Sequence, residues 1–199
     1  MYSKYDITTA KWGEVKEMGH YDMAILPWGA TEPHNLHLPY CTDMLTAQAV
    51  AFEVAEKAAM QGVNLMVLPG IPLGSQNPGQ IELPYCIHTS QTTQMAILRD
   101  VVRSLKRQGI RKLMIMSGHG GNNFKGIIRD IMIEDPEMII VHNEWFAIIP
   151  RTDYFEEKED DHAGELETSV MLHYYPDLVR MDLAGDGKFS KFGIEGLNT

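Results

Sequence analysis

Four short apolar runs alternate with four helix-like segments along this chain, and this alternation restricts the fold more than any other feature. The runs cover residues 22–27, 64–69, 111–116 and 137–142. Runs of this length and composition are typical of strands that are covered on both faces. Strands that alternate with helices form right-handed βαβ units. We therefore predict an α/β fold with a mainly parallel sheet and helices on both of its faces.

The segments between these runs carry helical spacing and the signals of helix ends. The expected helices span residues 44–60, 90–108, 123–134 and 164–174, and a short lead-in helix is expected within residues 7–15. Ser90 is a suitable N-cap, and Gly109 follows the end of the same helix. Loops are expected at residues 70–89, 150–161 and 185–199. Because the first of these loops is long for a compact domain, we expect it to be functional.

The composition argues against several classes of protein. The 199 residues suit a single domain, and 44% of them are apolar and 22% charged, as in ordinary globular proteins. A net charge of -10 argues against a nucleic acid or an anionic membrane as a partner, because both attract basic surfaces. Cys41 and Cys86 form no disulfide pattern, and no apolar run has the length of a signal peptide core or a membrane span. We therefore expect a cytoplasmic protein.

The loop after the first predicted strand contains four side chains of the types that bind divalent metals. Their identities are Glu32, His34, His37 and Asp43. Prolines and a glycine in the same stretch stiffen its backbone, which helps to hold ligands in place before a metal binds. Each residue also has an ordinary interpretation: Asp43 would serve as the N-cap of the following helix, and the others as surface residues. Their concentration in one loop favours a metal site.

The third predicted strand ends in a glycine-rich loop around His119, which has three interpretations. A phosphate-binding turn is physically sound, but the loop lacks the lysine of a P-loop. An oxyanion hole of the esterase type would need a Gly-x-Ser-x-Gly nucleophile motif, and the chain has none. A metal loop would use His119 as a ligand. This third interpretation also uses the residues after the first strand, because loops that follow parallel strands meet at one edge of the sheet.

Three stretches of the chain together resemble the creatininase (creatinine amidohydrolase) family. They are Pro27-x-Gly29-x-x-Glu32-x-His34-x-x-His37-Leu38-Pro39-x-x-Thr42-Asp43, Ser117-Gly118-His119-Gly120-Gly121-Asn122 and His162-Ala163-Gly164-Glu165-x-Glu167-Thr168-Ser169. The resemblance implies a single three-layer α/β/α domain over residues 1–199, and it allows for a C-terminal part beyond Thr199. It also implies an enzyme with two divalent metal ions, Zn or Mn with Fe as a further option. Such an enzyme cleaves a C–N bond of a small cyclic or linear amide, and homo-oligomers, often hexamers, are common.

The resemblance also assigns roles to individual residues. It implies that Glu32, His34, Asp43 and His119 bind metal, with Asp43 bridging the two ions. His162 matches a histidine near the substrate, and a histidine there is a candidate proton donor to the leaving nitrogen or a group that orients it. Two metals that share a carboxylate acidify a water between them, which then attacks the amide.

The chain departs from creatininase itself at Gly121, where that enzyme has a glutamate ligand. Glu165 is expected to replace this ligand, because it follows His162 by three positions and would face the same way on a helix. Glu167 lies about 200° around the helix from Glu165, and we expect it to make an outer or structural contact. Both acidic residues also suit the first turn of a helix for purely electrostatic reasons.

The sequence is also compatible with two other functions and with a contact between subunits. A deformylase or a peptide-processing amidase would use the same metal chemistry, whereas a non-catalytic α/β small-molecule-binding protein would keep the loops without the metal. Cys41 is expected to be a buried structural thiol. The apolar run at residues 144–150 is expected either to form a contact between subunits or to pack in its own core.

Overall fold

The computed structural model describes residues 3–148, 150–156 and 162–185. Its centre is a four-stranded sheet with the strand order β2-β1-β3-β4. The strands are β1 (Met23–Trp28), β2 (Leu65–Val67), β3 (Lys112–Ser117) and β4 (Ile139–Glu144). All three neighbouring pairs are parallel. The predicted parallel sheet is therefore confirmed, and the loops that follow β1, β2 and β3 leave from the same edge.

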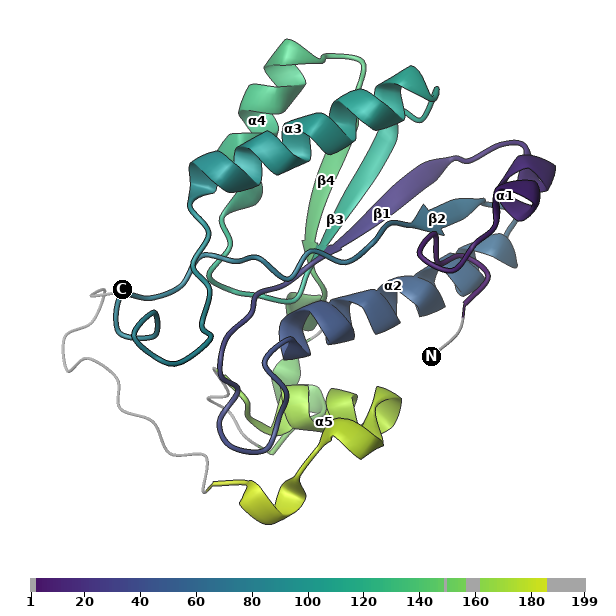
Figure 1. Ribbon diagram of the computed structural model, residues 1–199. Helices are drawn as coiled ribbons and strands as arrows, with labels where there is room; N and C mark the ends of the chain where they lie inside the picture. Colours follow the sequence, from purple (N-terminus) through teal and green to yellow (C-terminus); the bar gives the residue numbers. More distant parts are fainter. Residues whose placement is uncertain (1–2, 149, 157–161, 186–199) are drawn as a thin grey trace.

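Helices cover both faces of this sheet and produce three layers (Figure 1). The five α-helices of the described residues are α1 (Trp12–Met18), α2 (Thr42–Ala59), α3 (Gln91–Arg107), α4 (Phe124–Glu134) and α5 (Glu165–Tyr174). Figure 1 shows α3 and α4 together on one face and α2 on the other, with α5 packed beyond α2. Short 3-10 helices follow at η1 (Trp145–Ala147), η2 (Arg151–Asp153), η3 (Pro176–Leu178) and η4 (Met181–Leu183).

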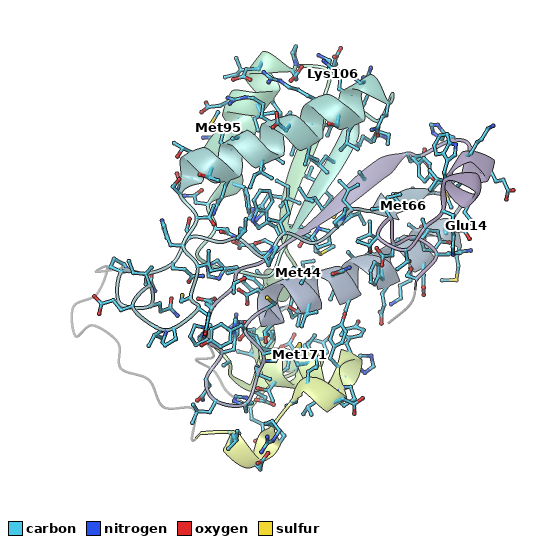
Figure 2. The ribbon with its side chains drawn as sticks, viewed as in Figure 1. Glu14, Met44, Met66, Met95, Lys106 and Met171 are labelled. Atoms are coloured by element: carbon cyan, nitrogen blue, oxygen red, sulfur yellow. The ribbon has the colours of Figure 1, made fainter. Side chains whose placement is uncertain are left out.

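Strand β1 shows why its sequence is apolar without interruption. Leu26 and Trp28 point into the core under α3 and α4, whereas Ile25 points into the core under α2. Successive side chains of a strand point to opposite faces, and here both faces are buried. Helix α5 joins the domain through a smaller cluster that includes Leu38 and the fully buried Met171, which Figure 2 labels.

Helix α3 follows its predicted boundaries within one residue. The Ser90 hydroxyl accepts a hydrogen bond from the backbone N–H of Thr93, as an N-cap does. The buried side chains of α3 recur every three or four positions, which is the spacing of one helix face. They are Gln94, Leu98, Val102 and Leu105. Residues 70–89 contain no helix or strand beyond isolated bridges, so the predicted loop is confirmed.

Two local expectations are wrong. The lead-in helix was expected within residues 7–15, but α1 spans Trp12–Met18, because Asp6 instead holds residues 6–10 in a turn through hydrogen bonds from Thr8 and Ala10. Asp43 is not an N-cap: α2 begins at Thr42, and Asp43 lies within its first turn. Of the expected loop at 150–161, residues 157–161 lie outside the described residues, and the described part contains the short helix η2. Of the expected loop at 185–199, only residue 185 is described. Within the part that is described, no helix is both long and apolar enough to cross a bilayer.

Candidate metal centre

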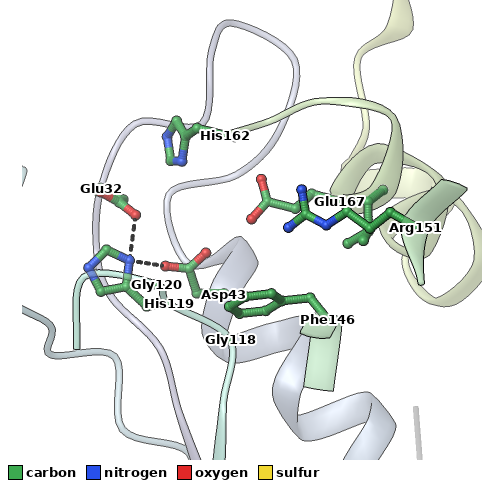
Figure 3. A pocket seen from close by; sticks show the side chains of 10 residues that line it. Glu32, Asp43, Gly118, His119, Gly120, Phe146, Arg151, His162 and Glu167 are labelled. Carbon is green, nitrogen blue, oxygen red and sulfur yellow. Dashed lines mark ion pairs between the residues drawn. The ribbon is translucent and has the colours of Figure 1, made fainter. Parts of the chain in front are cut away.

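Four of the predicted ligands come together at the carboxyl edge of the sheet. Glu32 and His34 lie in the loop after β1, Asp43 lies in the first turn of α2, and His119 lies in the loop after β3. All four side chains are buried. Figure 3 shows Glu32, Asp43 and His119 side by side. The convergence of loops that was expected from the parallel sheet is therefore confirmed.

His119 is held between two carboxylates and a backbone carbonyl. Its Nδ1 lies 2.9 Å from Oε1 of Glu32 and 3.1 Å from Oδ2 of Asp43. Its Nε2 lies 2.7 Å from the carbonyl oxygen of Ser75. Because a carbonyl only accepts, Nε2 carries the hydrogen, and Nδ1 is the nitrogen that faces the carboxylates. This arrangement is typical of a histidine that binds a metal.

His34 repeats this arrangement with the opposite nitrogens. Its Nδ1 donates to the carbonyl oxygen of Glu32 at 3.0 Å, and its Nε2 lies 2.8 Å from Oδ1 of Asp43. The same Nε2 lies 4.0 Å from Oε1 of Glu167. Asp43 therefore presents one oxygen to His34 and the other to His119, which is the position of a bridging carboxylate.

The carboxylates of the cluster stabilise positive charge on the groups beside them. Burial alone would lower the pKa of both histidines, but hydrogen bonds and charges from the carboxylates raise the pKa of His34 to about 9 and of His119 to about 10. Burial would raise the pKa of Asp43, yet the two histidines hold it well below its usual range. Burial raises the pKa of Glu167. Without metal, protons on the histidines balance the carboxylates.

The donor set fits two divalent ions. Among the described residues, three groups of side chains have ligand atoms within 4.8 Å of one another. They are Glu32, Asp43 and His119; His34, Asp43 and Glu167; and Glu32, His34 and His162. Ligand atoms around a tetrahedral zinc, each about 2.0–2.2 Å from the metal, lie roughly 3.3 Å apart, close to the separations found here. Oxygen and nitrogen ligands without thiolate suit Zn, Mn or Fe.

The structure brings Glu167, and not Glu165, to this cluster. Glu165 is in none of the three groups, and its carboxylate accepts a hydrogen bond from the backbone N–H of Glu156. The expectation counted helical positions from His162, but α5 begins only at Glu165, after Ala163 with a φ of 53° and an extended Gly164. His162 is therefore not on the helix, and the three-residue spacing does not apply.

His162 lines the same pocket from the stretch before α5. Its ring centroid lies 4.3 Å from that of His34, and its Nε2 lies 2.7 Å from the carbonyl oxygen of Pro33. Since that carbonyl only accepts, Nε2 keeps its hydrogen, and Nδ1 is the nitrogen that can gain or lose a proton. This geometry supports the expected position near a substrate.

His37 and Cys41 belong to the surroundings of the site. Nε2 of His37 lies 2.9 Å from the hydroxyl of Thr168, so this buried histidine connects the loop after β1 to α5. Burial lowers the pKa of His37, and the nearby His34 lowers it further. Cys41 is half-buried, its Sγ lies 3.6 Å from the hydroxyl of Thr31, and it is in none of the three ligand groups.

Four glycines pack against the two central ligands. A Cβ on Gly118 would lie 2.1 Å from the carbonyl oxygen of Asp43, and one on Gly29 would lie 2.7 Å from the Asp43 side chain. A Cβ on Gly74 would lie 2.8 Å from the ring of His119, and one on Gly121 would lie 2.5 Å from its Nε2. A side chain at position 121 would therefore require His119 or the Ser75 carbonyl to shift in this loop.

Several residues of the site were not singled out from the sequence. Asn122 ties the loops together: its Oδ1 accepts from the backbone N–H of Ser75 and from Nε2 of Gln94, each at 3.1 Å. Gln94 was detectable as a polar residue on the apolar face of its helix. Phe146 and Arg151 line the pocket. The apolar run at residues 144–150 marked Phe146 only as a subunit or core contact, and no sequence pattern marked Arg151, because both reach the pocket through the path of the chain after β4.

The fold and the cluster together define a class: an α/β protein with a centre for two metal ions at the carboxyl ends of parallel strands. A family model described as creatininase, creatinine amidohydrolase, matches residues 8–198. The chain belongs to the creatininase family.

Individual relatives agree with this assignment. A candidate creatinine amidohydrolase from Bacteroides fragilis has a solved structure with a TM-score of 0.94 and 55% identity, covering 98% of this chain and 77% of that one. The creatinine amidohydrolase of Pseudomonas putida is 30% identical over 81% of this chain and 68% of its own length. Creatininases with 26% and 25% identity have been solved in a Zn–Zn and an Mn form, with TM-scores of 0.77 and 0.75 and 84% of each covered.

Other relatives in the family carry different names. A mycofactocin precursor peptide peptidase of Mycolicibacterium smegmatis is 30% identical over 80% of this chain. A 2-amino-5-formylamino-6-ribosylaminopyrimidin-4(3H)-one 5'-monophosphate deformylase of Methanothermobacter marburgensis is 26% identical over 93% of it. The chain spans 61% of the peptidase and 72% of the deformylase.

Proposed function

We propose that this chain is a metal-dependent amidohydrolase that cleaves a C–N bond of a small cyclic or linear amide. One observation carries the proposal: the two oxygens of Asp43 face two separate histidines, at 2.8 and 3.1 Å. A carboxylate in this position holds two metal ions close together. Two divalent ions there would polarise the scissile carbonyl and lower the pKa of a water between them.

We assign the ligands from the two groups that share Asp43. Glu32 and His119 would hold one ion with Asp43, and His34 and Glu167 would hold the other with Asp43. Glu167 replaces our expectation of Glu165, because Glu167 lines the pocket and lies 4.0 Å from Nε2 of His34. Backbone carbonyls fix the hydrogens of both histidines on the far side of their rings, so that the near nitrogens are directed at the ions.

His162 is the proposed proton donor to the leaving nitrogen. The hydrogen bond from its Nε2 to Pro33 orients the ring and leaves Nδ1 for proton transfer. The residue lines the pocket with Glu32 and Glu167. Without a proton, the nitrogen would have to leave as an amide anion, which is a poor leaving group. A donor at this place would let it leave as a neutral amine and would speed the breakdown of the tetrahedral intermediate.

Metal content tests the proposal most directly. We expect purified protein to hold about two equivalents of Zn, Mn or Fe, as a dinuclear centre requires. Activity on a panel of creatinine, formamides and short peptides should disappear with a chelator and return with Zn or Mn. A wild-type protein that folds normally but holds no metal, and whose stability is unchanged when His34 and Asp43 are both replaced by Ala, would support a non-catalytic binding protein instead.

The identity of the natural substrate would distinguish a creatininase from a deformylase or a peptide-processing amidase. A deformylase and a peptide-processing amidase cleave the same type of bond, and relatives of both kinds match this chain. The pocket has a volume of about 110 Å³, which suits a small group at the metals. The same substrate panel separates these activities from hydrolysis of creatinine.

We also propose that the chain self-associates and works in the cytoplasm. Exposed apolar side chains gather on the loop after Gly79, and those of Ile81, Leu83, Tyr85 and Ile87 are each at least 45% exposed. In the run at 144–150, Phe146 lines the pocket and Ile148 is exposed, while residue 149 lies outside the described residues. Light scattering that gives a monomer at micromolar concentration would contradict self-association. The free thiols of Cys41 and Cys86 fit a reducing compartment, which cell fractionation would test.

A further inference from the structure

We propose that the amide substrate carries an anionic group, a carboxylate or a phosphate, and that Arg151 binds this group in the metal pocket. The inference rests on the proposed amidohydrolase function and adds the chemical class of its substrate. Arg151 belongs to η2, which follows β4 in the chain. Figure 3 shows its guanidinium beside Glu167, across the pocket from Glu32 and His119.

The lining of the pocket separates a reacting part from a recognition part. The carboxylates and histidines of the lining are occupied with metal binding and proton transfer, and two glycines complete that side. The remaining side chains are Phe146, Arg151 and Leu166. Among the described residues that line the pocket, Arg151 is the one with a permanent positive charge. The part of a substrate that extends from the amide therefore meets one cation and two apolar side chains.

The geometry of Arg151 suits an anion with two oxygens. Its guanidinium carbon lies 6.0 Å from the ring centroid of Phe146, within the range of cation–π attraction. The ring helps to orient the planar guanidinium. A guanidinium in a defined orientation can donate two parallel hydrogen bonds to a carboxylate or a phosphate.

The charge of the loaded site favours an anion as well. Glu32, Asp43 and Glu167 would bring three negative charges against four from two divalent ions, and a hydroxide between the ions would cancel the remaining positive charge, so Arg151 would give the loaded pocket its net positive charge. Once Glu167 binds metal, its charge is shared with the ion and stabilises the neighbouring guanidinium less. The chain as a whole carries a net charge of -10. Selection of an anion must therefore come from a local cation.

A purely structural role for Arg151 makes a different prediction. If Arg151 only positioned Glu167, its loss would lower metal content and would reduce activity on charged and neutral amides alike. If it binds the substrate, its loss would change the preference between them. The ratio of kcat/KM for an anionic amide to that for its neutral counterpart distinguishes the two roles.

The test uses the metal-loaded protein and three variants: Arg151→Gln, Arg151→Lys and the control Arg103→Gln, which removes an exposed charge from α3. The substrates are N-formylglycine, its neutral amide N-formylglycinamide and N-formyl-2-aminoethyl phosphate. We expect the wild type to prefer an anionic substrate by about 10- to 100-fold, the scale of a hydrogen bond to a charged group. Arg151→Gln should remove most of this preference through KM, and Arg151→Lys should restore part of it.

The remaining outcomes are equally defined. The anionic substrate that shows the preference tells a carboxylate from a phosphate. No preference in the wild type, or an equal ratio in wild type and Arg151→Gln, overturns the inference. If no amide is hydrolysed, the proposed function fails, and calorimetric titration of acetate and inorganic phosphate into the metal-loaded proteins decides the inference separately. Affinity that falls about tenfold in Arg151→Gln but not in Arg103→Gln supports it, and equal affinity, as for an anion held by metal alone, overturns it.

Discussion

The two halves of the metal centre share Asp43 but are held in different ways. In the His119 half, Glu32 and Asp43 lie within 3.1 Å of the histidine, and each carboxylate is only 2% exposed. In the His34 half, Glu167 is 17% exposed and lies 4.0 Å from the histidine. The first half is built from loops packed against glycines, whereas the second depends on where α5 docks. A site whose ligands are already in place binds metal more tightly, so we expect the His119 half to fill first.

The largest effect should come from Asp43→Asn, which removes the carboxylate common to both halves. We expect metal content to fall towards zero and activity to drop by at least about 10²–10³-fold, the scale for loss of one key electrostatic group. Elemental analysis and kcat/KM check this, with circular dichroism to show that the variant folds. Two equivalents of metal in this variant would show that Asp43 does not bridge.

Glu167→Gln should empty one half and leave the other. Metal content is expected to drop from about two equivalents towards one, because Glu167 contributes only to the His34 half. Glu165→Gln is the matched control, two positions away on the same helix, and should keep both equivalents. If the two variants behave in the opposite way, the ligand is Glu165, as the sequence first indicated.

Gly121→Ala should lower the metal affinity of the His119 half. The added Cβ would lie 2.5 Å from Nε2 of His119 and 2.6 Å from the carbonyl of Ser75, so it disturbs the hydrogen bond that orients the histidine. Loss of such an outer contact costs about 10- to 100-fold in metal affinity. Gly120→Ala, where a Cβ meets nothing within 4 Å, should stay near the wild-type affinity. Equal affinities in competition titrations with a chelator would disprove the packing argument.

The smallest effect concerns protons. His34 and His119 have pKa values of about 9 and 10 in the absence of metal, so both are protonated at pH 7, and a metal must displace these protons. Binding should release about two protons at pH 7, and apparent affinity should rise with pH until about pH 9–10. Calorimetry in two buffers of different ionisation enthalpy measures the number of protons that metal binding releases. Independence of affinity from pH between 6 and 9 would contradict it.

The strands and the residues in the loops that follow them were predictable from the sequence. The strands were visible as short apolar runs. In β1 and β2 both faces are buried, which leaves no polar position in the run, whereas the edge strand β4 is apolar although Ile139 and Val141 are exposed. Glu32, His34 and His119 were visible because each follows such a strand closely, and parallel strands end at one edge. Asp43 was visible because it ends the same stretch of potential ligands as Glu32 and His34. For these residues the position in the sequence nearly decides the position in space.

The positions of Glu167, Phe146 and Arg151 in the pocket depended on tertiary structure. Helical spacing could not choose between Glu165 and Glu167, since the choice follows from α5 beginning at Glu165 and from the way this helix packs against α2. Phe146 and Arg151 reach the pocket through a segment without regular structure beyond short 3-10 turns, and such a segment has no periodicity that marks a face. The sequence by itself determined the sheet and the candidate ligands in the loops that follow its strands. Only the packing of later elements decided which side chains join the second candidate ligand group and line the pocket, because their directions are set by long-range contacts and not by local spacing.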